Sequence, residues 1–348
     1  MSREITTPKG LSDVSTRFGH LGEASLERDP PLGPRESFLI AHDRIQTLAE
    51  IARRPSVVAA AVTPSGRLLD AALIEDGRAL TLGRHSRCGL RLPSSRAALR
   101  QITVLARREG DAMITRAWDL DTGAPFLTED GQQNAAVIAD GPLYFSVHGY
   151  AIWLVPSAMA AAWSGGARAV WDSLPGRVFV DRRPPAEAVR GRSADSPREA
   201  PERDLNVARW YAVPRTRIDD EISHVTGVGA ALVLGDPDDV EVSWGALRLE
   251  HRGRKQRHEV SAERLERGVL IGRYERCGLE IRAEPEISRV HALLVKIGVD
   301  VWAIDTASTN GVWRGGAAVE AEVLRDLDAL RLGKAVSVGW VRREIPDA

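Results

Sequence analysis

The stretch Gly83-Arg-His-Ser-Arg-Cys-Gly-Leu-Arg-Leu92 occurs a second time in the chain, as Gly272-Arg-Tyr-Glu-Arg-Cys-Gly-Leu-Glu-Ile281. Six of the ten positions are identical, and the two copies are offset by 189 residues (272 − 83). Solenoid units recur about every 20–50 residues, so an offset this long indicates two copies of a whole domain. Short runs of β-type residues separated by Gly, Asp and Pro surround each copy. This pattern of short strands and turns predicts an all-β fold of two antiparallel β-sandwiches.

Bulk composition bounds the class of protein. A chain of 348 residues predicts roughly two or three domains of about 150 residues each. The net charge of −1 gives no basis for a nucleic-acid or membrane-surface binder. Neither a membrane-spanning stretch nor a secretory signal is visible in the sequence. We therefore expect a cytoplasmic protein with no nucleic-acid partner and no membrane partner.

Three further features bear on the same expectation. Cys88 and Cys277 occupy the same position of the repeat, which favours packing by a small residue over a disulfide or a metal site. The basic run over 251–258 has acidic neighbours and no interleaved aromatic residues, which is typical of a solvated hairpin. No phosphate-binding loop, zinc-ligand spacing or nucleophile elbow is visible, so we expect no cofactor, no metal and no enzyme.

Composition also divides the chain into segments. The predicted order is a disordered tail over 1–35, a short amphipathic helix over 36–53, a sandwich over 57–157, a linker over 158–243 and a second sandwich over 244–345. Residues 181–204 are rich in Pro, Arg and other charged residues, so the linker is expected to be disordered there. An enzyme within the linker is a weaker hypothesis, because that stretch is too loose to form a catalytic core.

Three segments follow one another in the second copy. Gly272-Arg273 is followed by Ile287-Ser-Arg-Val-His291 and then by Ile304-Asp-Thr-Ala-Ser-Thr-Asn-Gly311. This set resembles the forkhead-associated (FHA) domain family, small β-sandwiches that recognise phosphothreonine. The pattern of that family is Gly-Arg, then Ser-x-x-His, then a segment like Asp-x-x-Ser-x-Asn-Gly. A lone arginine after a strand is usually a surface residue and Asn-Gly usually a hairpin turn, but neither reading explains why the three segments occur in this order.

The residue types fit the chemistry of a phosphate site. A phosphate on threonine brings nearly two negative charges and three acceptor oxygens. Its recognition calls for a guanidinium, hydroxyl groups and backbone N–H groups from tight loops. Arg273 supplies a bidentate cation, Ser288 and Thr309 supply hydroxyls, and Arg289 adds a second cation.

The resemblance implies the remaining roles. It implies that the Asn310 side chain hydrogen-bonds the backbone of the bound peptide, that His291 holds the Ser288 loop from inside, and that Asp305 braces the third segment. The candidate phosphopeptide-binding residues are Arg273, Ser288, Arg289, Thr309 and Asn310. The residues expected to support the site are Gly272, His291, Asp305, Ser308 and Gly311.

The first copy lacks these partners. An ungapped offset of 189 places Leu99 at Ser288, Arg100 at Arg289 and Ile102 at His291. Further on, Trp118 matches Trp302 at an offset of 184, which implies five extra residues (189 − 184) around 108–115 and favours a shared core role for the two tryptophans. Phe126 and Leu127 then stand at Asn310 and Gly311. An alignment that uses Ser94 or Ser95 for Ser288 restores neither the histidine nor the asparagine.

Energetics decides what the missing groups mean. Two lost hydrogen bonds to a charged ligand cost about 3–6 kcal/mol, or about 10²–10⁴-fold in affinity. Arg84 alone therefore predicts no ordinary phosphothreonine site in the first domain. We expect this domain to be a scaffold, or to bind something else through a different face.

The sequence thus favours a non-enzymatic adaptor in serine/threonine kinase signalling. Its expected partners are threonine-phosphorylated proteins, either substrates of a kinase or the kinase itself. A second hypothesis is a structural docking component of a larger assembly, secretion- or envelope-associated, with vestigial phosphate binding. An intramolecular phosphothreonine at Thr6, Thr7 or Thr216 is a third possibility, motivated by their place in loose sequence.

Overall fold

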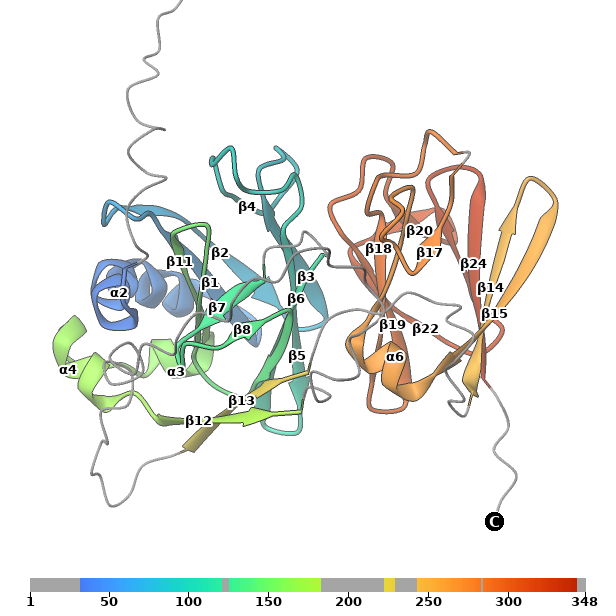
Figure 1. Ribbon diagram of the computed structural model, residues 1–348. Coiled ribbons are helices and arrows are strands. Elements are labelled where there is room, and N and C mark those ends of the chain that lie inside the picture. Colours follow the sequence, from blue (N-terminus) through green and yellow to red (C-terminus); the bar gives the residue numbers. More distant parts are fainter. Residues whose placement is uncertain (1–31, 121–124, 183–221, 229–242, 283, 343–348) are drawn as a thin grey trace, which may run out of the picture.

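The computed structural model describes residues 32–120, 125–182, 222–228, 243–282 and 284–342. Strands dominate these residues, which confirms the predicted all-β class (Figure 1). The tail up to residue 31, residues 183–204 of the stretch predicted to be disordered over 181–204, and Thr6, Thr7 and Thr216 lie outside the described residues. Asp181 ends strand β12 (Gly176–Asp181), contrary to that prediction.

The first sandwich consists of two sheets and the helices packed on one of them. The helices are α2 (Pro34–Ile51), α3 (Ser157–Ala161) and α4 (Ala167–Ser173). The strands are β1 (Ser56–Val62), β2 (Leu68–Glu75), β3 (Arg78–Gly83), β4 (Leu90–Arg91), β5 (Ile102–Glu109), β6 (Ala112–Asp119), β7 (Phe126–Thr128), β8 (Gln133–Asn134), β9 (Ala136–Ala139), β10 (Leu143–Val147), β11 (Tyr150–Pro156), β12 (Gly176–Asp181) and β13 (Ile222–Gly227). One sheet has the order β2-β1-β11-β10-β7-β8 and the other β12-β13-β9-β6-β5-β3-β4.

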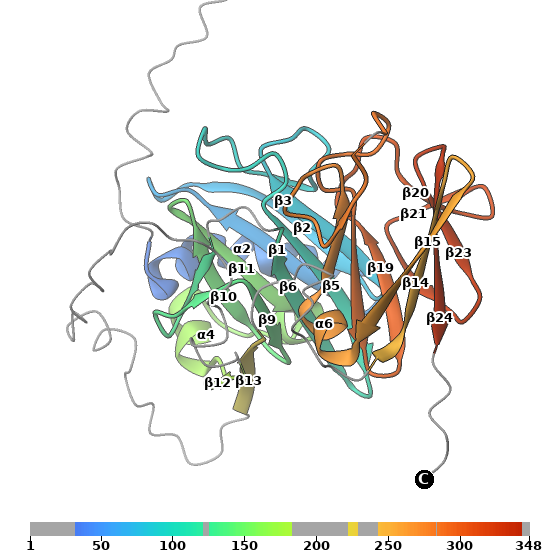
Figure 2. The same cartoon turned by 45° about the vertical axis from the view of Figure 1, so that its right-hand side comes forward.

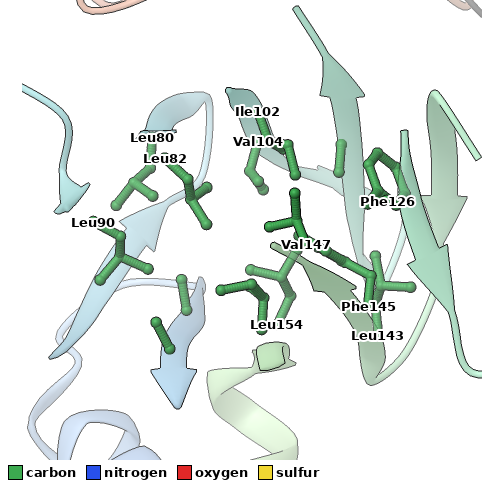
Figure 3. Packing of buried hydrophobic residues seen from close by; sticks show 14 of the residues in the cluster. Leu80, Leu82, Leu90, Ile102, Val104, Phe126, Leu143, Phe145, Val147 and Leu154 are labelled. Atoms are coloured by element: carbon green, nitrogen blue, oxygen red, sulfur yellow. The ribbon is translucent and has the colours of Figure 1, made fainter. Parts of the chain in front are cut away.

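Apolar side chains from both sheets fill the space between them. Figure 3 shows this core, in which Leu82, Ile102, Phe126 and Phe145 are fully buried. Phe126 and Phe145 pack with their ring centroids 4.8 Å apart. Because strand side chains alternate between faces, each strand gives every second residue to this core.

The outer face of the first sheet is buried as well, beneath the helices. The N-terminal helix α2 (Pro34–Ile51) places Phe38, Ala41 and Ile45 on one stripe, the spacing of an amphipathic helix. Phe38 meets Trp153 of β11 edge-on, with ring centroids 5.3 Å apart, and the Trp153 indole N–H donates to Ser37 Oγ at 3.0 Å. Every residue of β1 is therefore buried, with alternate residues facing the sandwich core and the helices.

The linker predicted over 158–243 contains helices and strands that belong to the first sandwich. Helices α3 and α4 pack against α2, and β12 and β13 add two strands to the first sandwich. Strand β13 pairs antiparallel with β9, placing Val225 opposite Ala139, and pairs parallel with β12. Val225 joins the sandwich core, and Phe179 packs against it from β12. These segments therefore belong to the first domain.

The second sandwich is built in the same way from a six-stranded and a five-stranded sheet. The strands are β14 (Ser243–His251), β15 (Arg254–Ser261), β16 (Val269–Gly272), β17 (Leu279–Glu280), β18 (Ala292–Ile297), β19 (Asp300–Asp305), β20 (Val312–Arg314), β21 (Ala317–Val319), β22 (Ala321–Leu324), β23 (Ala329–Leu332) and β24 (Val336–Arg342), and the helix is α6 (Ala262–Arg267). The sheet orders are β15-β14-β24-β23-β20-β21 and β17-β16-β18-β19-β22. The basic run over 251–258 covers the turn and second strand of the β14–β15 hairpin.

The two sandwiches pack directly against each other. Strands β5 and β6 of the first lie beside β18 and β19 of the second in both views (Figures 1 and 2). The apolar interface contains Leu105, Trp118, Leu120 and Ala136 from the first sandwich and Leu270, Leu293, Val295, Ile297, Trp302 and Ile304 from the second. In β19, Val301 and Ala303 face the core while Trp302 faces the interface. This packing explains why Leu293, Val295 and Trp302 are apolar although they point away from the core of their own sandwich.

Charged side chains border the interface. The Arg107 guanidinium lies over the Trp302 ring, 5.1 Å from its centroid, and approaches Asp300 at 3.7 Å. Arg78 approaches Glu320 at the same distance. Within the described ranges, no helix combines the length and the apolar character needed to cross a membrane.

Candidate functional site

The repeated Gly-Arg motif ends a central strand where another loop passes very closely. A Cβ atom at Gly272 would lie 2.1 Å from the carbonyl oxygen of Arg289, and one at Gly83 would lie 2.6 Å from that of Leu99. Only glycine allows this approach. The buried thiols of Cys277 and Cys88 donate to the same two carbonyl oxygens at 3.3 Å. Burial raises the pKa of Cys88 to about 11. The same glycine and thiol contacts occur in both copies, so the repeat serves the architecture of both sandwiches.

Arg273, Ser288 and Thr309 come together at one end of the second sandwich. The Ser288 hydroxyl lies 3.4 Å from the Thr309 hydroxyl and accepts from the Thr309 backbone N–H at 2.9 Å. Arg273 is exposed, and its Nε donates to the Ile287 carbonyl oxygen at 2.6 Å. That bond uses Nε and fixes the base of the guanidinium next to the Ser288 loop. The result is a cation beside two hydroxyl groups.

His291 holds the Ser288 loop from inside. Its ring is fully buried, its Nδ1 accepts from the Ser288 N–H at 3.1 Å, and its Nε2 donates to the Gly311 carbonyl oxygen at 3.0 Å. These two bonds select the neutral tautomer with the proton on Nε2. Burial lowers the pKa of His291, which favours the same neutral form. The side chain therefore ties two of the three motif segments together.

The third segment is a tight loop held by its own polar groups. The Asp305 carboxylate accepts from the Ser308 N–H at 2.9 Å, and the Ser308 hydroxyl accepts from the Gly311 N–H at 2.9 Å. Ala307 and Gly311 have φ values of 58° and 76°, in the left-handed region. Gly311 suits that conformation, whereas Ala307 is held there against its preference.

Asn310 is half-buried at the edge of the loop. Its Nδ2 donates to the Glu286 carbonyl oxygen at 2.7 Å, and its own carbonyl oxygen accepts from the Trp313 indole N–H at 2.7 Å. The side chain is thereby oriented by contacts within the domain. Trp313 and Glu286 were not among the residues predicted from the sequence, and no motif marks either of them.

The first sandwich also reaches this loop, which the sequence did not predict. Arg87 donates from Nη1 to the carbonyl oxygens of Ser308 at 3.0 Å and Thr309 at 2.5 Å. The Arg100 Nε donates to the Ala307 carbonyl oxygen at 2.9 Å. These contacts depend on how the two sandwiches pack against each other, and the sequence alone does not indicate that packing.

Backbone hydrogen bonds correct the alignment of the first copy by one residue. The Arg84 N–H donates to the Ala98 carbonyl oxygen as the Arg273 N–H donates to that of Ser288. Ala98, not Leu99, therefore corresponds to Ser288, and it follows that Leu99 corresponds to Arg289 and Arg100 to Val290. The correction arises because the loop after Leu92 is one residue shorter than the loop after Ile281.

The counterpart of His291 is Gln101 rather than Ile102. The Gln101 N–H donates to Leu82 as the His291 N–H donates to Ile271, and Gln101 Oε1 accepts from the Ala98 N–H at 2.9 Å. Gln101 thus takes over the bond that His291 makes to Ser288. The Ala98 side chain has no hydroxyl, so the first copy still lacks the group that Ser288 supplies in the second copy.

The offset beyond this loop also differs from the predicted one. Leu120 donates to Gln101 as Thr306 donates to His291, which gives an offset of 186 (306 − 120) against 190 at Gln101 (291 − 101). The first copy has four extra residues (190 − 186), because the β5–β6 hairpin is two pairs longer than the β18–β19 hairpin.

Two assignments change as a result of this offset. At 186, Trp118 corresponds to Ile304 rather than to Trp302, and both tryptophans lie in the interface between the sandwiches, not in a shared core. Phe126 starts β7 as Val312 starts β20, so Phe126 does not correspond to Asn310. The same offset assigns Ala124 to Asn310, at a position outside the described residues.

Comparison with known proteins finds several similar solved structures and one matching family. The FHA-1 domain of Mycobacterium tuberculosis Rv1747 is 24% identical, covering 28% of this chain and 98% of its own, with a TM-score of 0.24. Slr1951 from Synechocystis sp. is 24% identical, covering 30% and 100%, with a TM-score of 0.26. Mycobacterium tuberculosis EmbR, in complex with a low-affinity phosphopeptide, is 22% identical, covering 30% and 26%, with a TM-score of 0.24. No curated protein matches the chain significantly. The sequence profile of the FHA domain matches residues 269–333, and this part of the chain is a forkhead-associated domain.

Proposed function

We propose that this protein is an adaptor that binds threonine-phosphorylated partner proteins through its C-terminal FHA domain. The observation that carries the proposal is the grouping of Ser288 and Thr309, whose hydroxyls lie 3.4 Å apart, beside the exposed guanidinium of Arg273. This grouping offers one cation and two hydroxyl groups to a dianion that has three acceptor oxygens.

The surroundings of the group support binding rather than chemistry. The His291 ring contacts the Ser288 loop, but it is fully buried and both of its nitrogens are hydrogen-bonded to the backbone. It is therefore a positioning residue. Arg273 is a permanent cation, and selectivity against unmodified threonine comes from the missing dianion.

Asn310 supplies the contact that fixes the peptide rather than the phosphate. Its amide nitrogen is engaged by Glu286, and within the described residues its amide oxygen accepts no hydrogen bond. In this proposal, that oxygen accepts from a backbone N–H of the ligand. Arg289, exposed next to Ser288, adds positive charge to the peptide path.

The proposed partners are substrates of a serine/threonine kinase, or the kinase itself. Such partners occur where kinases act, in the cytoplasm, and the two buried cysteines, which remain thiols, are compatible with that reducing compartment.

A peptide library tests the proposal. The full-length protein is incubated with a degenerate library centred on phosphothreonine and with the same library unphosphorylated. We expect binding to the phosphorylated library alone, and a loss of about 10- to 150-fold in Arg273→Ala, since a hydrogen bond to a charged group contributes about 1.5–3 kcal/mol.

Arg254→Ala is the matched control, because Arg254 is an exposed arginine on β15, at the far edge of the other sheet. It removes the same charge and is expected to leave binding unchanged. Binding that ignores the phosphate, or that survives Arg273→Ala, would refute the proposal and would favour a phosphate-independent docking role.

A further inference from the structure

A cleft of about 560 Å³ lies between the two sandwiches, next to the candidate site. Arg84 and Arg100 line it from the first sandwich, and Arg273 and Arg289 line it from the second. No Asp or Glu is among the described residues that line this cleft. Its volume falls in the range of about 300–1,000 Å³ that is common for ligand sites. The cleft is therefore spacious and strongly positive.

Arg100 is the most unusual of these four residues. Its side chain is nine-tenths buried, with 9% of the residue exposed, and its Nη2 has no hydrogen-bond partner among the described residues. Its Nε donates to the Ala307 carbonyl oxygen at 2.9 Å, so the guanidinium is held in place. A buried cationic donor without a partner is costly, and an anion in the cleft would offset that cost.

Burial and the neighbouring groups act on the pKa of Arg100 in different directions. Burial is the largest cause and lowers this pKa, Cys88 raises it, and the positive charge of Arg87 lowers it to a smaller extent. Asp305 acts in the opposite direction, but its Oδ1 already accepts from the Ser308 N–H. The remaining charge calls for an acceptor that the described residues do not supply.

The position of Arg273 indicates what kind of anion binds in the cleft. Arg273 belongs both to the group formed with Ser288 and Thr309 and to the lining of the cleft. A peptide bound at that group therefore has the cleft beside it. Two guanidinium groups from the first sandwich present several N–H donors, which suits the three oxygens of a phosphate better than the two of a carboxylate.

We propose that Arg84 and Arg100 bind a second phosphate on the same peptide, so that the protein prefers doubly phosphorylated segments. This inference rests on the proposed function of the C-terminal FHA domain. It gives the first sandwich a role in ligand selection, although that sandwich lacks a phosphothreonine site of its own.

Fluorescence anisotropy on the full-length protein tests the inference. The probes are a phosphothreonine peptide selected from the library, a series in which phosphoserine is added at successive positions on either side, and the same series with glutamate in place of phosphoserine. We expect at least one doubly phosphorylated peptide to bind about tenfold or more tightly than the singly phosphorylated one. Glutamate at that position should give a smaller gain.

Two variants locate the effect. Arg84→Ala removes an exposed cleft arginine that lies outside the Ser288 and Thr309 loops, and it should remove most of the preference. Arg100→Gln should do the same. Arg254→Ala should keep the full preference, because Arg254 lies outside the cleft.

The outcomes separate this inference from the one on which it rests. If the singly phosphorylated peptide binds through Arg273 but no second phosphate improves affinity, the cleft inference alone is wrong. A preference that persists in the Arg84→Ala/Arg100→Gln double variant also overturns it alone. If the singly phosphorylated peptide does not bind, or binds regardless of Arg273, both proposals fail.

Discussion

The guanidinium of Arg87, in the first sandwich, donates a hydrogen bond of 2.5 Å to the carbonyl oxygen of Thr309, in the second. The loop that presents the Thr309 hydroxyl is thus held partly from outside its own domain. Arg100 adds a bond to Ala307, two residues earlier. The first sandwich is therefore structurally coupled to the candidate site.

Replacing Arg87 tests this coupling. Arg87→Ala removes the bonds to Ser308 and Thr309, each worth about 0.5–1.5 kcal/mol. We expect faster amide hydrogen exchange over 307–311 and a severalfold loss of phosphopeptide affinity. Arg254→Ala, which removes an equal charge elsewhere, should change neither quantity. Unaltered exchange in Arg87→Ala would show that the contact does not order the loop.

Acid is expected to destabilise the second sandwich through His291. Because burial holds the pKa of this residue below its unfolded value of about 6.5, its contribution is complete above that pH and is lost as pH falls through the folded pKa. Protonation of Nδ1 also removes the acceptor for the Ser288 N–H. The melting temperature and phosphopeptide affinity should both decrease between about pH 7 and pH 5.

The first sandwich supplies the matched variant for this effect. Gln101 fills the position of His291 there and accepts from Ala98 as His291 accepts from Ser288. His291→Gln should keep much of the loop order and show a weaker acid dependence, whereas His291→Ala should lose stability at every pH. Some dependence will remain, because burial also lowers the pKa of His85, His148 and His258. Identical pH profiles for wild type and His291→Gln would assign the effect to those other histidines.

Gly272→Ala tests the close approach that the repeated motif requires. The added Cβ would lie 2.1 Å from the Arg289 carbonyl oxygen, so backbone must shift. We expect a loss of about 1–3 kcal/mol in unfolding free energy, the usual cost of overpacking. Gly176→Ala is the control, because nothing lies within 4 Å of its added Cβ. Equal stability of the two variants in denaturant titration would contradict the geometry.

Trp302→Ala tests the interface between the sandwiches. Its side chain faces the other domain while Val301 and Ala303 face the core, so the change should loosen docking and leave the second sandwich folded. We expect an increased radius of gyration in small-angle X-ray scattering and faster proteolysis between the domains. An unchanged scattering profile would mean that the remaining apolar contacts hold the docking by themselves.

Much of the fold was predictable from two sequence features. The two copies of the repeat are far apart in the chain, and short apolar runs separated by turn residues mark the strands around each copy. The three motif segments of the second copy fall between strands that bring Arg273, Ser288 and Thr309 together. The spacing of the three segments was enough to predict that these residues lie together, because each segment ends or begins a strand of one small sandwich.

The remaining features depend on contacts that sequence does not display. Strands β12 and β13 form because β13 pairs with β9 and β12 pairs with β13. The sequence of these segments alone is typical of a linker. The predicted alignment of the first copy was wrong by one residue. The loop after Leu92 is one residue shorter than the loop after Ile281, and no identical residues in these loops reveal the difference. Arg87 and Arg100 read as ordinary charged residues until the second sandwich docks against them.

Backbone amide NMR shifts test whether the C-terminal domain recognises the phosphate at Arg273, Ser288 and Thr309. The full-length protein is titrated with a phosphothreonine peptide from the library and, separately, with the same peptide after dephosphorylation. We expect shifts concentrated at Arg273, Ser288, Thr309 and Asn310 with the phosphorylated peptide and none with the dephosphorylated peptide. Shifts centred elsewhere, or equal shifts with both peptides, would contradict phosphate recognition at this site.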